Sequence, residues 1–173
     1  MPNIILIQNE YFDSESLLHV LNYVLDSDTV GGYALSTNHA YRQMMMVKNA
    51  YHKTEGAQLI HFIISFSTND AYRMTIDEML NVGYWAAQQL GNFQVAYALH
   101  TDTCHFHLHL VVNTVSYEDG RRYSDGMGYF WKLQNELRYV FPKSDVGLYK
   151  SYPLSSVNKY MEAEENNSFL RIR

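Results

Sequence analysis

The middle of the chain reads His100-Thr-Asp-Thr-Cys-His-Phe-His-Leu-His-Leu-Val-Val-Asn113 and holds four of the protein's eight histidines. From position 105 to position 110, histidines alternate strictly with apolar residues. A period of two is typical of a β-strand that buries one face. The pattern therefore predicts a strand that points His105, His107 and His109 to one side and their apolar neighbours to the other.

The segment before this strand, Gln94-Val-Ala-Tyr-Ala-Leu-His100, also has the composition of a strand. Residues 101–104 are few and polar, which suits a tight turn. A hairpin at this point returns the three later histidines close to His100. Imidazole is the commonest side-chain metal ligand, so imidazoles on two paired strands predict a metal site. The alternative is that these histidines only form hydrogen bonds. It is disfavoured because one hairpin contains four histidines together with Asp102.

The order H-x-D-x-x-H-x-H-x-H, followed by a short apolar run and Asn113, resembles the third motif of relaxases. Relaxases are the mobilisation nucleases of conjugative plasmids and transposons. They belong to the endonucleases named for a histidine-hydrophobe-histidine signature, which His107-Leu108-His109 matches here. The resemblance extends more weakly from about residue 17 to about residue 149.

The resemblance implies that His100, His107 and His109 hold one divalent metal ion. We expect Mn²⁺ or Mg²⁺, while Zn²⁺, Co²⁺ and Ni²⁺ also suit a three-histidine site. Three further polar side chains are expected to surround these ligands without binding the ion: His105, His61 and Asn113.

Tyr23 lies near the C-terminal end of a predicted helix that runs to about Leu25. Helical spacing alone fits a half-buried core tyrosine. Relaxases, however, carry their nucleophilic tyrosine in an early helix followed by a turn-like segment, so the resemblance implies that Tyr23 attacks DNA. The product would be a 5′-phosphotyrosine and a free 3′-hydroxyl. Asp102 would orient His100 or help to deprotonate Tyr23. Three other tyrosines are the alternative nucleophiles: Tyr11, Tyr33 and Tyr41.

The resemblance also implies origin-of-transfer DNA, as a single strand or a hairpin, as the substrate. Accessory mobilisation and coupling proteins are the other implied partners. The loop over residues 26–37 contains two glycines, so it can cover a bound strand while Tyr33 stacks on a base. Basic residues after the histidine motif are candidate phosphate contacts, although they can equally form an ordinary solvated face: Arg121, Arg122, Lys132 and Arg138.

The overall charge argues against nucleic-acid binding. The formal net charge is -5 and the pI is about 5.9, whereas phosphate binding normally requires a basic surface. Two other functions also remain open. One is a hydrolase in which a metal-bound water attacks in place of tyrosine, and the other is a relative that binds DNA without nicking it.

The order of predicted strands and helices indicates an α/β (α+β) sandwich. We expect an antiparallel sheet of about five strands with helices packed on one face and the histidines on the other. Residues 1–153 would form the catalytic domain, and residues 154–173 a polar, acidic tail. No apolar run approaches the length of a membrane span. The single cysteine excludes an internal disulfide and fits a bacterial cytoplasm.

Overall fold

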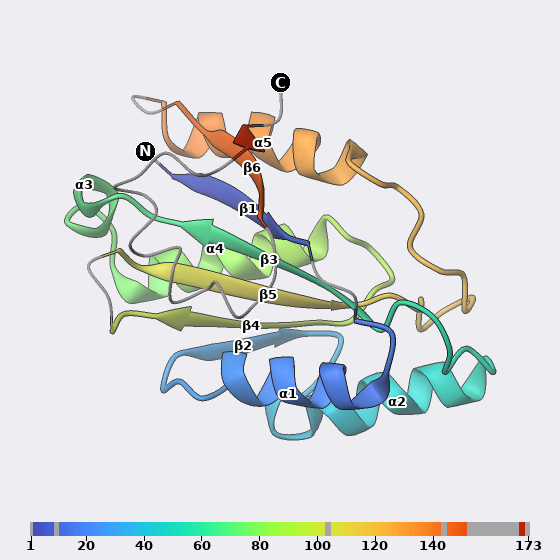
Figure 1. The fold of residues 1–173 in the computed structure, drawn as a ribbon. Helices are drawn as coiled ribbons and strands as arrows, with labels where there is room; N and C mark the ends of the chain where they lie inside the picture. The colour runs from blue at the N-terminus through green and yellow to red at the C-terminus, as the bar shows by residue number, and fades with distance from the viewer. Residues whose placement is uncertain (1, 9–10, 103–104, 143–144, 152–169, 172–173) are drawn as a thin grey trace.

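The strands of the protein form one mixed sheet, seen face-on in Figure 1. The computed structural model describes residues 2–8, 11–102, 105–142, 145–151 and 170–171. Within these residues the sheet has seven strands in the order β2-β4-β5-β3-β1-β6-β7. The strands are β1 (Asn3–Ile7), β2 (Val30–Tyr33), β3 (Leu59–Ser65), β4 (Val95–His100), β5 (His107–Asn113), β6 (Gly147–Ser151) and β7 (Leu170–Arg171). The α-helices are α1 (Ser14–Val24), α2 (Ala40–Ala50), α3 (Thr68–Ala71), α4 (Ile76–Gln88) and α5 (Gly128–Val140), and a 3-10 turn, η1 (Thr37–His39), precedes α2.

The predicted α/β class is confirmed, but the sheet is larger than the expected five strands. β2 lies in a segment that we expected to be a loop. That expectation was wrong because the pair Gly31-Gly32, which has low β-propensity, is nevertheless part of a strand. A Cβ at Gly31 would lie 2.3 Å from the ring of Tyr97, so glycine lets this ring lie against the backbone of β2, which pairs with β4. β6 pairs with β1 in parallel, and the other strand pairs are antiparallel.

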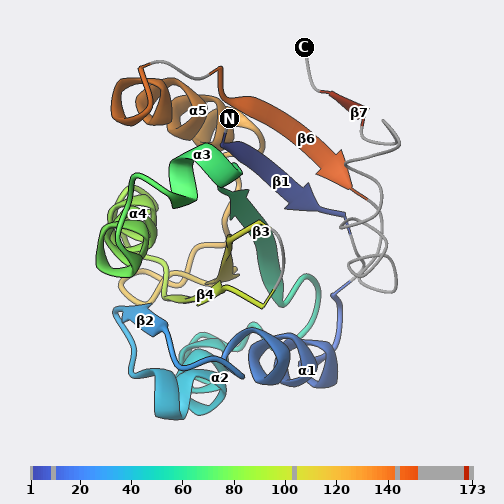
Figure 2. The same cartoon turned by 90° about the vertical axis from the view of Figure 1, so that its left-hand side faces the viewer.

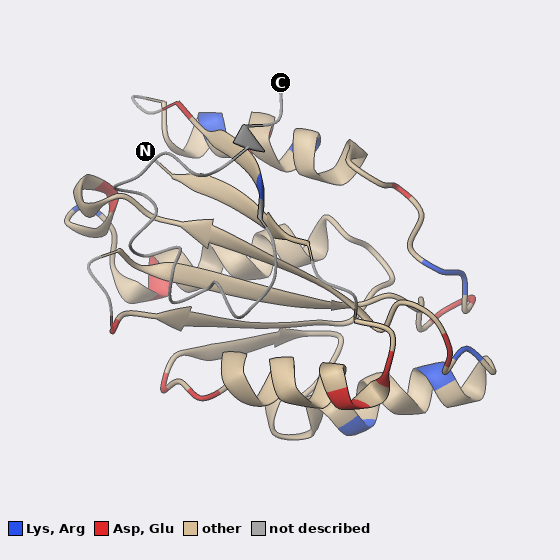
Figure 3. Cartoon of the chain, viewed as in Figure 1, with Lys and Arg blue, Asp and Glu red and all other residues tan. Residues whose placement is uncertain are grey.

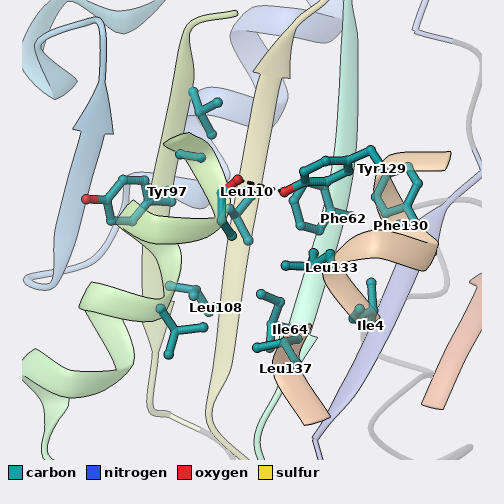
Figure 4. Close-up of a cluster of buried hydrophobic side chains, with 14 of the residues drawn as sticks. Ile4, Phe62, Ile64, Tyr97, Leu108, Leu110, Tyr129, Phe130, Leu133 and Leu137 are labelled. Atoms are coloured by element: carbon teal, nitrogen blue, oxygen red, sulfur yellow. Dashed lines mark hydrogen bonds between the residues drawn. The ribbon is translucent and has the colours of Figure 1, made fainter. Parts of the chain in front are cut away.

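Helices α4 and α5 cover one face of the sheet (Figure 2). Alternate residues of the central strands point to them, including Phe62, Leu108 and Leu110, which are all fully buried. Figure 4 shows this cluster, where Phe62 meets the rings of Tyr129 and Phe130. Full burial of one such apolar side chain contributes about 1.5–3 kcal/mol. The apolar half of the alternating pattern therefore lies in the main core, as predicted.

Helices α1 and α2 correct the expectation that helices pack on one face only. They lie against the histidine side of the sheet, where Leu17, Leu21 and Met44 pack on Ala96, Ala98 and Val111. Ala96 and Ala98 of β4 have short apolar side chains, so the helices can pack closely on this face of the strand. The histidine face is consequently open only in part, and the C-terminal end of α1 reaches the histidine end of β4.

The C-terminal part of the chain differs from a simple tail. Leu170–Arg171 returns to the sheet as β7 and pairs with β6. The expected domain boundary at residues 153 and 154 lies outside the described residues. Among the helices that the structure describes, none is long and apolar enough to cross a membrane.

A buried lysine joins α2 to the sheet at the end that lies away from the histidines. Lys48 is fully buried, and its Nζ donates to the carbonyl oxygen of Gln58 at 2.8 Å and to Thr114 Oγ1 at 3.3 Å. Burial, and then the like charge of Arg122, lowers the pKa of Lys48 to about 7 from its ordinary 10.5. The unfolded chain therefore binds more protons than the folded chain between these two pH values.

We predict that Lys48 makes the protein more stable as the pH rises from about 7 towards 10. Lys48→Met removes this titration. Between about pH 7 and about pH 9.5, the free energy of unfolding of the wild type should therefore rise, relative to that of the variant, by on the order of 3 kcal/mol. Urea unfolding of both proteins at the two pH values measures the shift. Parallel pH dependences in the two proteins would contradict the lowered pKa.

Candidate active site

Strands β4 and β5 place the histidines of the hairpin side by side. His100, the last residue of β4, is the Cα partner of His107, the first residue of β5. His109 lies two residues later on the same face, opposite Ala98. The ring centroids of His100 and His109 are 4.6 Å apart. The structure thus brings together the three histidines that the sequence singles out as metal ligands.

His109 is held from the neighbouring strand by His61. Both rings are buried, and His61 Nε2 lies 3.1 Å from His109 Nδ1. One proton is shared in this contact, so the tautomer of one imidazole fixes that of the other. When His109 Nδ1 carries the proton, His109 Nε2 keeps a free lone pair. His61 therefore lies where the resemblance puts it, beside a candidate ligand.

His100 is bonded to the end of the first helix. Its Nε2 is 2.9 Å from the carbonyl oxygen of Val24, the last residue of α1. A carbonyl oxygen accepts, so Nε2 carries the proton and Nδ1 keeps its lone pair. The last carbonyls of a helix have no partner within the helix, and the imidazole supplies one here. This bond joins α1 to the histidine strand.

Tyr23, the residue before Val24, faces the same histidines. Its ring meets the ring of His100 edge-on at a centroid distance of 5.5 Å and the ring of His109 at 5.6 Å. Tyr23 is 41% exposed, so the residue is partly open to solvent. Burial, and then the negative charge of Asp102, raises the pKa of Tyr23 above its ordinary value. The phenol is therefore protonated at neutral pH.

Three imidazoles at the site, those of His61, His107 and His109, are neutral at physiological pH. Burial, and then the nearby His105 and His100, lowers the pKa of His107 to about 4. The pKa of His61 falls to about 3 for the same reasons, burial first and then His100. The pKa of His109 is lowered well below its ordinary value, mainly by burial. A neutral imidazole is the form that binds metal ions.

The donor set suits a divalent metal, but the side chains are not yet arranged around one point. Among the residues that the structure describes, no three His, Cys, Asp or Glu side chains are already positioned to hold an ion. His100 Nε2 bonds to Val24, and His109 Nδ1 bonds to His61. Ligation by the three histidines would therefore use the remaining nitrogens of these two rings or require His100 to turn. The assignment of the metal ligands remains a prediction.

The turn of the hairpin lies partly outside the described residues, since positions 103 and 104 are not described. Asp102 is exposed at the start of the turn, and its charge acts on both Tyr23 and His107. His105 precedes β5 and acts electrostatically on His107. Both residues therefore lie at the predicted site, although neither belongs to a strand.

Asn113 does not belong to this cluster. It is the last residue of β5, at the opposite end of the strand from His107, and it is fully buried. Its Nδ2 donates to Gln94 Oε1 at 3.0 Å and to the carbonyl oxygen of Met44 at 3.3 Å. The expectation that Asn113 surrounds the metal ligands is wrong in position. Asn113 instead joins β5 to α2 and to the residue before β4.

The candidate phosphate contacts also lie away from the histidines. In Figure 3 the basic stretch 121–122 lies at the opposite end of the sheet from the β4–β5 turn. Arg122 donates to the carbonyl oxygens of Ala57, Lys53 and Glu55, and Arg121 pairs with Asp119. Lys132 and Arg138 belong to α5, on the other face of the sheet, where they pair with Glu136 and Asp145. The structure therefore does not bring these four residues to the site.

The other candidate tyrosines are separated from the histidine cluster. Tyr33, the residue expected to stack on a DNA base, packs against the α4 side of the sheet and meets the ring of Tyr84, so it does not face the histidines. Tyr11 is buried, and Tyr41 packs with the α1–α2 cluster. Between described residues, the tyrosine ring contacts with these histidines are made by Tyr23. Geometry therefore favours Tyr23 over the three alternatives.

Sequence reasoning missed the contacts that hold the end of α1. The carbonyl oxygen of Val24 and the hydroxyls of Ser27 and Thr29 all bond to the end of β4. Backbone acceptors leave no mark in a sequence. The run Asp26-Ser-Asp-Thr29 offered a weak signal, since short hydroxyl side chains after a helix often bond to backbone groups.

Comparison with known families gives this geometry a context. The nuclease domain of MobA/VirD2-like relaxases matches residues 23–141, from the tyrosine at the end of α1 to the end of α5. The chain belongs to this relaxase family. The match includes Tyr23 and the whole histidine hairpin.

Individual relatives agree with this assignment. The chain is 26% identical over 113 residues to the protein rlx of Staphylococcus aureus, covering 64% of this chain and 34% of that protein. Another rlx protein of the same organism is 33% identical over 94 residues, covering 54% of this chain and 26% of the relative. The chain thus spans about a third of the length of these relatives.

A solved structure has the same fold. It is the MobM relaxase domain (MOBV; Mob_Pre) bound to 26-nucleotide pMV158 oriT DNA, with a TM-score of 0.54 and 13% identity over 84% of this chain and 87% of that one.

The contacts of Arg122 predict a structural role. Arg122→Ala should lower the free energy of unfolding by about 1–3 kcal/mol, because three carbonyl oxygens lose a charged donor. Arg121→Ala is the matched control, since its exposed pair with Asp119 should contribute little. Urea unfolding and fluorescence anisotropy with a labelled single strand measure stability and DNA affinity. A loss of DNA affinity at unchanged stability in Arg122→Ala would restore its assignment as a phosphate contact.

Proposed function

We propose that this chain is the catalytic domain of a DNA relaxase that nicks single-stranded origin-of-transfer DNA through Tyr23. The observation that carries the proposal is the contact of Tyr23 with His100 and His109 at centroid distances of 5.5 and 5.6 Å. A tyrosine that only filled the core would not need a half-exposed ring at a cluster of imidazoles. Membership of the relaxase nuclease family supports the same reaction.

In the proposed step, the hydroxyl oxygen of Tyr23 forms a bond to the phosphorus of the scissile phosphodiester. The bond from phosphorus to the 3′ oxygen breaks, and this oxygen leaves with a proton as a 3′-hydroxyl. The 5′ side of the nick stays on the protein as a phosphotyrosine. Because the phosphoester energy is kept in that bond, attack by a 3′-hydroxyl reverses the step and religates the strand.

Deprotonation of Tyr23 is the step that needs help. Its raised pKa means that the proton must leave as the new bond forms, because little phenolate exists beforehand. We assign the acceptor role to Asp102, whose charge reaches both Tyr23 and His107. An exposed carboxylate at the start of the turn can pass the proton on to solvent.

We infer that a divalent ion is held by His100, His107 and His109. Imidazoles on adjacent strands supply the lone pairs, and the His61 contact orients His109. When bound, such an ion polarises the scissile phosphate and offsets charge in the transition state. Mn²⁺ and Mg²⁺ are the ions we expect, and Zn²⁺, Co²⁺ and Ni²⁺ suit the same nitrogens.

The proposed substrate follows from family and fold. The MobM domain with the same fold is bound to oriT DNA, which suggests origin DNA as the substrate class here. The basic side chains at the described surface lie mainly away from the histidines, and the chain has a net charge of -5. We therefore expect base stacking and the metal site to contribute more to binding than phosphate contacts do.

Metal binding by the histidines is directly testable. His107→Ala or His109→Ala should weaken Mn²⁺ binding by more than about a hundredfold, because loss of a ligand costs more than loss of a group that orients one. His105→Ala should have a smaller effect, and the exposed His19→Ala is the control. Isothermal titration measures each affinity. Wild-type affinity in the His107 or His109 variant would exclude that residue as a ligand.

Tyr23→Phe should abolish nicking while Mn²⁺ and DNA binding persist, because the ring and its packing remain and only the hydroxyl is lost. The assay is denaturing gel electrophoresis after incubation with Mn²⁺ and a labelled single strand that covers the origin. Tyr41→Phe, on the neighbouring helix, is the matched control and should still form the shifted protein–DNA band.

Two other results would change the proposal. A shifted band from Tyr23→Phe would move the nucleophile to Tyr11, Tyr33 or Tyr41. Cleavage without a band in the wild type would indicate attack by a metal-bound water, and binding without cleavage would indicate a relative that only binds DNA.

A further inference from the structure

The residues that follow Tyr23, from Val24 to Thr29, are hydrogen-bonded to the end of β4. α1 ends at Val24 without a glycine, and no basic side chain lies in its last turn. Many helices end on a glycine that satisfies their last carbonyls. Here the end of α1 is instead hydrogen-bonded to β4, both by Val24 itself and by residues that follow the helix.

Two hydroxyl side chains make most of this attachment. Ser27 Oγ and Thr29 Oγ1 both donate to the carbonyl oxygen of Leu99, at 2.9 and 3.1 Å. The backbone N–H of Leu99 donates to the carbonyl oxygen of Thr29 at 2.9 Å. The two hydroxyl oxygens lie 3.3 Å apart, and the N–H of Thr29 donates to Ser27 Oγ at 3.2 Å. The two residues are thus bonded to each other and to the residue before His100.

We propose that Ser27 and Thr29 are positioning residues that hold the end of α1, and therefore Tyr23, in place beside His100 and His109. This inference rests on the proposed function, since it concerns the placement of the nucleophile. The two hydroxyls do not touch the reacting atoms. They act through the backbone that connects Thr29 to Val24.

The geometry explains why such an attachment matters. Tyr23 is half-exposed, and its ring meets the histidines by edge contacts, which resist sliding only weakly. Within the described residues, α1 is hydrogen-bonded to the cluster through the carbonyl oxygen of Val24, which accepts from His100. A nucleophile misplaced by about 1 Å can lose on the order of a hundredfold in rate. The bonds to Leu99 restrain the same end of the helix without using any candidate metal ligand.

The alternative is that the two hydroxyls only stabilise the fold. Thr75 separates the two roles, because it also makes side-chain bonds at a helix end but lies on α4, on the other face of the sheet. Thr75→Val removes a comparable hydroxyl without touching α1. A purely structural role predicts that Thr75→Val and a Ser27→Ala/Thr29→Val double variant affect activity alike at equal loss of stability.

The experiment compares four proteins: the wild type, Ser27→Ala/Thr29→Val, Thr29→Ser and Thr75→Val. The rate of covalent adduct formation with Mn²⁺ and a labelled origin strand is measured together with DNA affinity and thermal stability. We expect at least about a tenfold lower rate in the double variant, with DNA affinity within about twofold of the wild type. Thr29→Ser keeps the hydroxyl and should retain the rate, and Thr75→Val should match the wild type.

A second readout does not depend on nicking. Nuclear Overhauser contacts between the rings of Tyr23 and His100 should be seen in the metal-free wild type and in Thr29→Ser, and should weaken in the double variant. If the wild type forms no adduct, the proposed function fails, and these contacts still decide the positioning role. Unchanged ring contacts in the double variant, or an adduct rate equal to that of Thr75→Val, would overturn the inference.

Discussion

The register of β5 between β3 and β4 is the constraint on which the site depends. A slip of one residue would exchange the two faces of the strand, placing His107 and His109 in the main core and Leu108 and Leu110 on the open face. Burying two unpaired imidazoles in place of two leucines would be strongly unfavourable. Burial of the leucines in the core under α4 and α5 therefore determines that His107 and His109 lie on the other face of the sheet.

The second requirement is that α1 ends at the histidine end of β4. The apolar stripe of α1 packs over β4 and β5, which sets the direction of the helix. The bond of Val24 to His100 and the bonds around Leu99 then fix where it stops. A helix bound by packing alone could slide along the sheet. Hydrogen bonds at its end give the adjacent Tyr23 a definite place, so the proposed nucleophile and the imidazoles are parts of one arrangement.

The sequence predicted the central strand pair because a period of two is a local signal that the structure preserves. His107 and His109 follow from it directly, whereas Tyr23 was distinguished from a core residue by family resemblance. Features that depend on distant contacts were not predictable. The face on which Tyr33 lies depends on the pairing of a glycine-rich strand with β4, and Arg122 donates to carbonyl oxygens more than sixty residues away in sequence. Asn113 matched the motif, but its partners come from other elements.

Identification of the residue that carries DNA after the reaction is the most direct test of the proposed mechanism. The protein would be incubated with Mn²⁺ and a single-stranded origin oligonucleotide, denatured, and digested with a protease and a nuclease before mass spectrometry. Our account predicts a nucleotide attached through its 5′-phosphate to Tyr23, located by fragment spectra of the N-terminal peptide. A nucleotide on Tyr11, Tyr33 or Tyr41, or cleaved DNA with a free 5′-phosphate and no modified peptide, would contradict it.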